Sequence, residues 1–259
     1  MISPALTWKG RVAAILSCSA IGRLLAVLLH DRIPNRGCVI DTSSPVIVPS
    51  IKASLFWGFY ESPEIRFVQR YLRNDLDVVE LGSSIGVVSA HIARKMGQDR
   101  RLICVEPYSG LLDEIRINLA LNAPRACYEI VHGAIDYSPE HRDGVALAVG
   151  ERNLGSRVVA AADAAAQACI RVPAVTLSDI LAQHRIQSYA LVADIEGGEA
   201  GLLEHEEGAL AQCQQLIIEL HAATYAGRPV GPEALDAALR SRHGFKLCDR
   251  RATVGVYER

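Results

Sequence analysis

Hydrophobic positions change their spacing repeatedly along the chain from residue 76 onward. Short apolar runs of strand length alternate with longer segments in which apolar residues recur every three or four positions, as they do on one face of a helix. Strands that alternate with helices in this way predict βαβ units joined into a parallel sheet. The expected strands are 78–81, 102–105, 128–131, 189–193 and 215–220, and the expected helices are 87–96, 111–121, a segment that begins near Thr176 or Ser178, and 233–242.

Two parts of this region depart from the simple alternation of strand and helix. Between about 136 and 175 the pattern predicts extra strands at 145–149 and 157–160, and we interpret this stretch as an insertion. Near the end of the chain, 245–248 and 253–257 predict a β-hairpin. We therefore expect a Rossmann-like α/β fold: a seven-stranded, mostly parallel sheet that ends in an antiparallel hairpin, with helices on both faces.

The first 75 residues lack this alternation, and we expect them to form an N-terminal helical extension and cap on a main domain spanning 76–259. Their most apolar segment, 12–29, is interrupted by two serines and by Arg23, and is shorter than the roughly 20 apolar residues of a membrane-spanning helix. We predict a helix that packs on the domain or on a second copy of the chain in a homodimer; the alternatives are a helix on a membrane surface and an inserted one. The remaining pattern predicts a loop at 34–37, a short β-like piece at 46–48 and a helix at 64–72.

Composition narrows the class of protein. Hydrophobic residues make up 50% of the chain and charged residues 22%, which is typical of a globular protein. The formal net charge of −2 provides no general attraction to nucleic acid, so we expect no nucleic-acid partner. The seven cysteines occur singly, without CxxC spacing, which predicts reduced thiols and a cytoplasmic protein.

A glycine-rich turn is predicted between a strand and a helix in the sequence Glu80-Leu81-Gly82-Ser83-Ser84-Ile85-Gly86. Gly82 and Gly86 allow a sharp turn and a close approach of the backbone to a ligand. Glu106 ends the next strand, where a carboxylate can accept hydrogen bonds from both hydroxyls of a ribose. Glycine turns also have purely structural uses, but the turn and the acid together predict nucleoside binding.

Two nucleoside cofactors fit such a turn: a nicotinamide dinucleotide and S-adenosylmethionine (SAM). The dinucleotide fingerprint GxGxxG has a second glycine that makes room for the pyrophosphate, and this chain has Ser84 there. SAM has no pyrophosphate and does not need that glycine. Glu80 adds an acid that can hold the amino group of a cationic ligand. The turn therefore favours SAM, and a nicotinamide-dependent oxidoreductase is the alternative.

Acidic residues gather near the ends of the fourth and fifth predicted strands of the parallel pattern. Asp194, Glu196 and Glu199 follow the fourth strand, and Glu219 and His221 stand at the end of the fifth. We expect these side chains at the edge of the sheet where ligands of open α/β folds bind. One of Asp194, Glu196 or His221 can act as a general base. For Glu199 the alternative is an acid stabilised by the dipole at a helix N-terminus.

The same acids allow a second chemistry, the binding of a divalent metal that holds substrate oxygens. Asp194 and Glu219 would reach one ion if they project from neighbouring strand ends. No spacing in the sequence requires a metal, and the metal ligands stay unassigned.

The motifs resemble those of the FkbM family of SAM-dependent methyltransferases, over the stretch from Ser54 to Glu219. An antiparallel hairpin at the end of a parallel sheet is likewise the layout of class I methyltransferases. The chain departs from the usual family pattern at Glu80 and at Ser83-Ser84. The matching pieces are Phe56 to Glu61, Val79 to Gly86, Val105-Glu106-Pro107, Asn118 to Asn122, Thr176 to Asp179, Asp194 to Glu199 and Ile217 to His221.

The resemblance implies an enzyme that binds SAM and methylates a hydroxyl of a small-molecule or saccharide acceptor, such as a sugar or a secondary metabolite. A SAM-binding interaction module without turnover is an alternative, against which the intact set of acids argues. The implied catalytic residues are Asp194, Glu196, Glu219 and His221. The implied cofactor-binding residues are Glu80, Gly82, Ser83, Ser84, Gly86, Glu106, Pro107, Ala134 and Asp194.

Overall fold

The computed structural model describes residues 8–138, 144–148, 157–159 and 169–259 of the chain. The chain divides into two compact units, Met1–Ser62 and Pro63–Arg259. The larger unit contains the central sheet and all of the candidate site residues named above.

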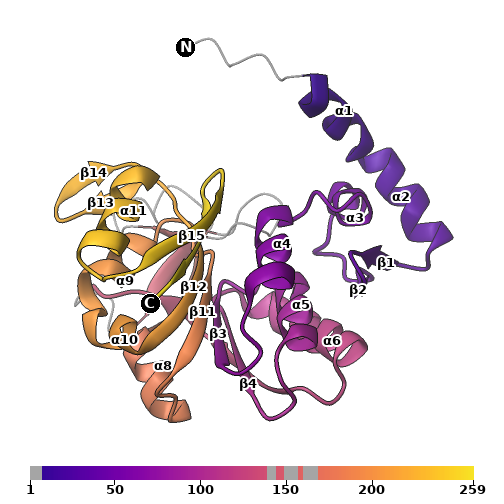
Figure 1. The fold of residues 1–259 in the computed structure, drawn as a ribbon. Coiled ribbons are helices and arrows are strands. Elements are labelled where there is room, and N and C mark those ends of the chain that lie inside the picture. The colour runs from indigo at the N-terminus through magenta and orange to yellow at the C-terminus, as the bar shows by residue number, and fades with distance from the viewer. Residues whose placement is uncertain (1–7, 139–143, 149–156, 160–168) are drawn as a thin grey trace. The chain divides into compact units, whose positions relative to one another are not determined.

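A seven-stranded sheet forms the centre of the larger unit (Figure 1). Its strands lie in the order β15-β16-β12-β11-β3-β4-β5. The strands from β12 to β5 in this order run parallel, and β16 is antiparallel to both of its neighbours. This confirms the predicted, mostly parallel sheet with a terminal hairpin. The strands are β3 (Asp77–Leu81), β4 (Arg101–Glu106), β5 (Cys127–His132), β11 (Tyr189–Ala193), β12 (Cys213–Glu219), β15 (Lys246–Arg251) and β16 (Val254–Glu258).

Alternate residues of the strands face opposite sides of this sheet. Val79 and Leu81 of β3 belong to a buried cluster with Leu177 and other apolar residues of the later helices. Glu80, between them, points to the other side, where Ser89 donates a hydrogen bond to its carboxylate. Helices therefore cover both faces, as predicted. They are α5 (Val87–Lys95) and α6 (Leu112–Asn122) on one face and α8 (Leu177–His184), α9 (Glu199–His205), α10 (Glu207–Gln212) and α11 (Pro232–Ser241) on the other.

The helix α4 (Ser62–Tyr71) belongs with this sheet, and its position agrees with the helix predicted at 64–72. The phenol of Tyr71 donates a hydrogen bond to Asp249 of β15 at 2.6 Å. The side-chain amide of Gln215 on β12 donates to the carbonyl oxygen of Tyr71 at 3.0 Å. The larger unit therefore begins ahead of the boundary expected between residues 75 and 76.

Helix starts in the second half of the chain follow from local sequence. The hydroxyl of Thr176 accepts a hydrogen bond from the backbone N–H of Asp179 at 3.1 Å, so Thr176 caps α8 as expected. Pro232 is the first residue of α11, where its fixed φ suits a helix and its missing N–H costs no bond. The helix that the dipole alternative for Glu199 implies is present, since α9 begins at Glu199. The short helix α10 and the hairpin of β13 (Ala223–Tyr225) and β14 (Arg228–Val230) are not predicted from the sequence.

The stretch interpreted as an insertion forms a separate small sheet. Its middle strand, β7 (Val145–Ala148), pairs antiparallel with β8 (Arg157–Val159) and with β9 (Cys169–Val172). This confirms the predicted extra strands, although Val149 and Ala160, the predicted ends, lie outside the described residues. The return strand β9 is not predicted by the sequence. A short parallel pair flanks the sheet, β6 (Ala134–Ile135) with β10 (Ala174–Val175).

The smaller unit begins with α1 (Trp8–Leu16) and α2 (Ser19–Leu28). The single helix predicted within 12–29 is therefore wrong, because the backbone at Cys18 is extended, with φ −72° and ψ 153°. Across the described residues, every helix is too short or too polar to cross a bilayer. Packing of α1 and α2 on a second copy of the chain, or on a membrane surface, stays a prediction.

The rest of the smaller unit corrects two predictions. The strands β1 (Arg32–Asn35) and β2 (Cys38–Asp41) form an antiparallel hairpin, so half of the loop predicted at 34–37 is paired strand. The β-like piece predicted at 46–48 is wrong, because these residues lie in turns and bends immediately before α3 (Pro49–Phe56). Proline at the first helical position favours that helix start directly after the apolar run.

Gly82 gives a test of the packing between β3 and β11. Its φ is +86°, and a Cβ atom built on it would lie 1.9 Å from the carbonyl oxygen of Asp194. We expect Gly82→Ala to lower the free energy of unfolding by about 3 kcal/mol or more, because alanine disfavours the left-handed backbone and its Cβ atom would overlap the carbonyl oxygen. Urea denaturation measures this change.

Gly208, in α10, is the matched control, because a Cβ atom there meets nothing within 4 Å. Gly208→Ala should be neutral or stabilising by up to about 1 kcal/mol, since alanine favours the helix. Equal effects of the two substitutions would contradict the close contact at Gly82.

Candidate active site

The order of the strands reverses between β3 and β11. From β3 the chain adds β4 and β5 on one side, and it then returns to add β11 and β12 on the other side. In open α/β sheets, ligands bind outside the carboxyl ends of the strands at such a point. The glycine turn follows β3, and Asp194 directly follows β11, so both predicted halves of the site meet at this edge.

The glycine turn, 82–86, is held against α6. The side-chain amide of Asn118 donates a hydrogen bond to the carbonyl oxygen of Ile85 at 2.8 Å. Gly86 has φ +78°, and a Cβ atom there would lie 2.9 Å from the Cα atom of Ile115. Both glycines of the turn are therefore required by the packing of the protein on itself, whether or not a ligand approaches them.

Ser84 and Glu106 are joined within the turn. Ser84 has a left-handed backbone, with φ 50°, which is uncommon for a residue other than glycine. One carboxylate oxygen of Glu106 accepts from the backbone N–H of Ser84 at 2.8 Å, and the other accepts from the N–H of Tyr108 at 2.8 Å. Burial raises the pKa of Glu106 to about 7. The predicted ribose acceptor thus supports the turn, and each of its oxygens retains capacity for a further donor.

Glu80 is buried within the same turn. One of its oxygens accepts hydrogen bonds from the hydroxyls of Ser83 and Ser89, which joins β3 to the first turns of α5. The other oxygen, Oε1, has no hydrogen-bond partner in the part of the chain that the structure describes. Burial raises the pKa of Glu80 to about 7. The structure therefore shows Glu80 as a support of the turn, and its contact with a cofactor stays a prediction.

Pro107 and Ala134 are the remaining residues that the resemblance assigns to the cofactor. Pro107 follows Glu106 directly, and its carbonyl oxygen lies 3.0 Å from Nε2 of His132 at the end of β5. Ala134 is buried in β6, where it pairs with Ala174 of β10. Both residues lie just beyond the carboxyl ends of strands, and their contact with a cofactor stays a prediction.

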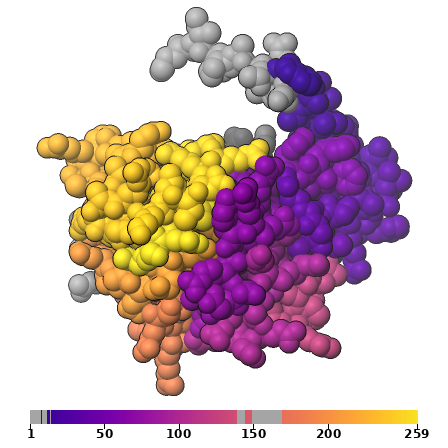
Figure 2. Space-filling view, in the orientation of Figure 1, coloured from indigo at the N-terminus to yellow at the C-terminus, as the bar shows by residue number. Residues whose placement is uncertain are grey.

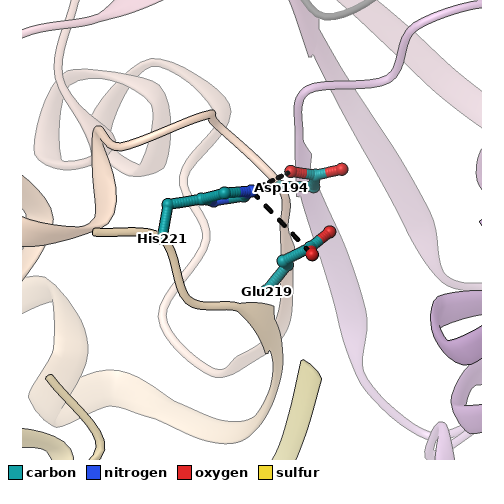
Figure 3. Close-up of side chains that lie close together, drawn as sticks. All are labelled: Asp194, Glu219 and His221. Atoms are coloured by element: carbon teal, nitrogen blue, oxygen red, sulfur yellow. Dashed lines mark ion pairs between the residues drawn. The ribbon is translucent and has the colours of Figure 1, made fainter. Parts of the chain in front are cut away.

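The predicted catalytic residues come together at the ends of β11 and β12, and Figure 3 shows three of them, Asp194, Glu219 and His221. Nε2 of His221 lies 3.9 Å from Oδ1 of Asp194 and 3.9 Å from Oε1 of Glu219. Oε2 of Glu196 lies 3.7 Å from the same nitrogen. The hydroxyl of Thr253, from the turn between β15 and β16, donates a hydrogen bond to Oε1 of Glu219 at 2.7 Å. Three acids that the sequence places at the ends of two different strands thus face one imidazole.

Glu199 holds that imidazole from its other side. Its side chain is fully buried, and Oε1 lies 3.0 Å from Nδ1 of His221. The same carboxylate accepts the backbone N–H groups of Ile195 and Gly197 at 3.2 and 3.0 Å. The alternative of a simple helix N-terminal acid therefore describes only part of its role, because Glu199 also fixes the loop after β11 and the orientation of His221.

Glu64, from α4, is a member of the site that the sequence analysis misses. It is 6% exposed, and in the described ranges of the chain its Oε2 atom has no hydrogen-bond partner. Its carboxyl group is close enough to Glu219 and His221 for both to change its pKa. We refer below to Glu64, Asp194, Glu196, Glu199, Glu219 and His221 together as the acid–histidine cluster.

Burial and the crowding of carboxyl groups change the pKa values of several residues in the cluster. Burial, and then the negative charges of Glu219 and Glu196, raise the pKa of Asp194 to about 8. Burial, with the neighbouring Glu219, raises the pKa of Glu64 to about 7. The hydrogen bond to Glu199 raises the pKa of His221 to about 9, against the effect of burial. Shifts of this size at the carboxyl ends of strands are typical of functional sites.

The fold and the site together define a Rossmann-like α/β protein with a nucleoside-type glycine turn beside an acid–histidine cluster. Residues 80–247 match the Methyltransferase FkbM domain family, and the chain belongs to this family. The matched segment contains the glycine turn, Glu106 and every member of the cluster except Glu64. The resemblance read from the sequence motifs is therefore confirmed.

The chain is also similar to other known proteins. It is 25% identical to malate dehydrogenase of Aliivibrio fischeri (strain MJ11) over 126 residues, which are 49% of this chain and 39% of that relative. A methyltransferase structure from Geobacter sulfurreducens has a TM-score of 0.43 and 14% identity, covering 93% of this chain and 86% of the other. A putative methyltransferase from Pseudomonas syringae has a TM-score of 0.41 and 16% identity, covering 78% and 99%. Family membership rests on the matched sequence and not on these similarities.

The buried Glu80 predicts a specific pH dependence of stability. Its folded pKa of about 7 lies above the ordinary value of 4.5, so the folded protein binds its proton more tightly than the unfolded chain does. The contribution of Glu80 to the free energy of unfolding is present in full below pH 4.5, and it is lost as the pH rises through 7. Glu80→Gln removes this titration. Relative to the wild type, the free energy of unfolding of the variant should therefore increase by up to about 3 kcal/mol between pH 5 and pH 8.5.

Urea midpoints of both proteins at the two pH values measure this difference. Glu233→Gln is the control, because the Glu233 side chain is 82% exposed. A difference between Glu80→Gln and wild type that stays constant with pH would mean that Glu80 is ionised in the folded protein throughout this range.

Proposed function

We propose that this protein is a SAM-dependent methyltransferase that methylates a hydroxyl of a saccharide or secondary metabolite. The observation that carries the proposal is the contact between Gly82 and Asp194, which sets a nucleoside-type turn directly beside the acid–histidine cluster. A cofactor and an acceptor bound to these two parts would be neighbours. Family membership supports the reaction, and the resemblance to hydroxyl-methylating members supports the acceptor class.

The residues around the turn suit the nucleoside part of SAM. Glu106 ends β4 with acceptor capacity left on both oxygens, and would accept from the ribose hydroxyls. The turn from Gly82 to Gly86, Pro107, Ala134 and Asp194 would surround the rest of the cofactor. When bound, SAM supplies an electrophilic methyl group on a positively charged sulfur. The protein's own task is then to orient the acceptor and to receive its hydroxyl proton.

The acid–histidine cluster supplies a proton acceptor for the hydroxyl. Glu199 fixes the imidazole through Nδ1, so Nε2 faces Asp194, Glu196 and Glu219. A base held in one orientation by a buried carboxylate is the arrangement that general-base catalysis by histidine uses. We therefore place the acceptor hydroxyl at this end of the cluster, where Asp194, Glu196 and His221 are all within its reach.

The raised pKa values predict that activity increases with pH. Asp194 is protonated below about pH 8 and His221 is charged below about pH 9, so neither can accept a proton well at pH 7. We expect kcat/KM to increase between pH 7 and 9, with release of S-adenosylhomocysteine from a panel of hydroxylated acceptors as the assay. His221→Asn should lower kcat by about 10²- to 10⁴-fold. His205→Asn, at a half-exposed histidine outside the cluster, should leave kcat unchanged.

The cofactor assignment is tested by calorimetric titration with S-adenosylhomocysteine and, separately, with NADH. We expect micromolar binding of S-adenosylhomocysteine and no binding of NADH. Glu106→Ala should weaken binding at least tenfold, because it removes the ribose acceptor and frees the turn. Asp113→Ala, at a side chain that is 85% exposed on α6, is the control. Binding of NADH alone would overturn the proposal in favour of an oxidoreductase, the class of the malate dehydrogenase relatives.

A further inference from the structure

Three ligand atoms in the acid–histidine cluster are spaced as they would be around one ion. The atoms belong to Asp194, Glu219 and His221, and all lie within 4.8 Å of one another. Nε2 of His221 is 3.9 Å from each of the two carboxylates, which is too long for a hydrogen bond. Ligands about 2.1 Å from one octahedral cation are themselves roughly 3 to 4.2 Å apart. The present spacing needs little adjustment to hold a cation.

Once it is deprotonated, the histidine has a lone pair directed for coordination. With Nδ1 hydrogen-bonded to the buried carboxylate of Glu199, the neutral imidazole carries its proton on Nδ1 and its lone pair on Nε2. Histidines that bind metals nearly always donate their other N–H to a carboxylate or a carbonyl in this way. Glu199 would therefore be a positioning residue, and Nε2 of His221 a ligand.

Glu64 is an independent observation that points to a cation. It comes from a different part of the chain, it is 6% exposed, and its Oε2 atom has no hydrogen-bond partner among the residues that the structure describes. Its neighbours are the acids Glu219 and Asp194 and the imidazole of His221. A buried carboxylate is costly unless it is paired, protonated or bound to a metal. Within the same described part of the chain, Oδ1 of Asp194 is a second buried oxygen without a hydrogen-bond partner.

The cluster also lacks the usual compensation for its negative charge. In the part of the chain that the structure describes, no lysine or arginine forms an ion pair with Glu64, Asp194 or Glu219. Five carboxyl groups thus surround one imidazole. Carboxylate oxygens with a single imidazole favour Mg²⁺ or Mn²⁺ over the softer metals that thiolates select.

We propose that Asp194, Glu219, His221 and Glu64 form a binding site for one divalent cation of the Mg²⁺ or Mn²⁺ class. Asp194 and Glu219 are each about a quarter exposed, with side-chain exposures of 29% and 26%, so one side of the site is open to further oxygen ligands. The location explains why Glu64 is an acid on the otherwise apolar inner face of α4.

The cation would define the acceptor more narrowly, and this step rests on the proposed function. Two open coordination positions fit an acceptor with a second oxygen next to the reacting hydroxyl, such as a vicinal diol. The cation would lower the pKa of the bound hydroxyl, whose proton would pass to Glu196, the exposed acid of the cluster, while the oxygen stays on the cation. His221 is then a ligand, and a bound cation should shift the alkaline rise in activity to lower pH.

The first test uses Mn²⁺ alone, with the full chain freed of metal by a chelator. Electron paramagnetic resonance of free Mn²⁺ should show one bound ion per chain with a micromolar dissociation constant. Asp194→Asn and Glu64→Gln should each weaken binding at least tenfold, and Glu233→Gln, an exposed acid, should not change it. Binding that is unaffected by Asp194→Asn and Glu64→Gln, or no binding at all, would overturn the site.

Glu64→Gln carries its own control for folding. Because burial raises the pKa of Glu64, the substitution should increase the urea midpoint of the metal-free protein at pH 8. A variant that is more stable and yet binds Mn²⁺ more weakly has lost a ligand and not its fold. A lower urea midpoint together with unchanged Mn²⁺ affinity would mean that Glu64 has only a structural role, which contradicts the proposal.

The calorimetric titration with S-adenosylhomocysteine separates this inference from the proposed function. Binding of the nucleoside without Mn²⁺ binding overturns the cation site and leaves the methyltransferase proposal in place. Binding of Mn²⁺ without binding of the nucleoside supports the cation site and overturns the methyltransferase proposal. Neither titration requires knowledge of the acceptor.

Discussion

The contact between Gly82 and the carbonyl oxygen of Asp194 is the constraint on which the site depends. The backbones that leave β3 and β11 approach so closely that a single added carbon would overlap. β3 and β11 are neighbours in the sheet although residues 82–188 separate them along the chain. Their contact joins the glycine turn to the acid–histidine cluster. It requires glycine at position 82 for two reasons, the lack of space for a side chain and the left-handed backbone.

The acid–histidine cluster is costly to fold. Burial and neighbouring carboxyl groups raise the pKa of Glu64 and of Asp194. Among the described residues, each of these two side chains also has a buried oxygen without a hydrogen-bond partner. Apolar side chains of similar volume would be expected to be at least as stable. The arrangement is instead the one expected of a functional site. Glu199 fixes one side of the imidazole, and Thr253 fixes Glu219. Asp194 and Glu196 remain partly accessible at the edge of the sheet.

Sequence patterns predict the central sheet well because the spacing of apolar residues there differs clearly between strands and helices. They also place Asp194, Glu196, Glu219 and His221 together, since parallel strands end at one edge. The same reasoning fails at 46–48, where an apolar run precedes a helix start at Pro49. It misses Glu64 because a lone acid at the start of an amphipathic helix has the pattern of an ordinary dipole-stabilising residue, and only the folded chain brings α4 to the end of β12.

The hydrogen bond from Thr253 to Glu219 has a consequence for the assembly of the protein during synthesis. Glu219 ends β12, but the hydroxyl that orients its carboxylate lies in the turn of the last hairpin, whose strand β16 pairs with residues 215–219 of β12. Domains are made from the N-terminus onward. A growing chain can therefore form the glycine turn and its strand neighbours well before the final hairpin leaves the ribosome. A growing chain that has not yet reached Thr253 therefore lacks the hydroxyl that orients the carboxylate of Glu219.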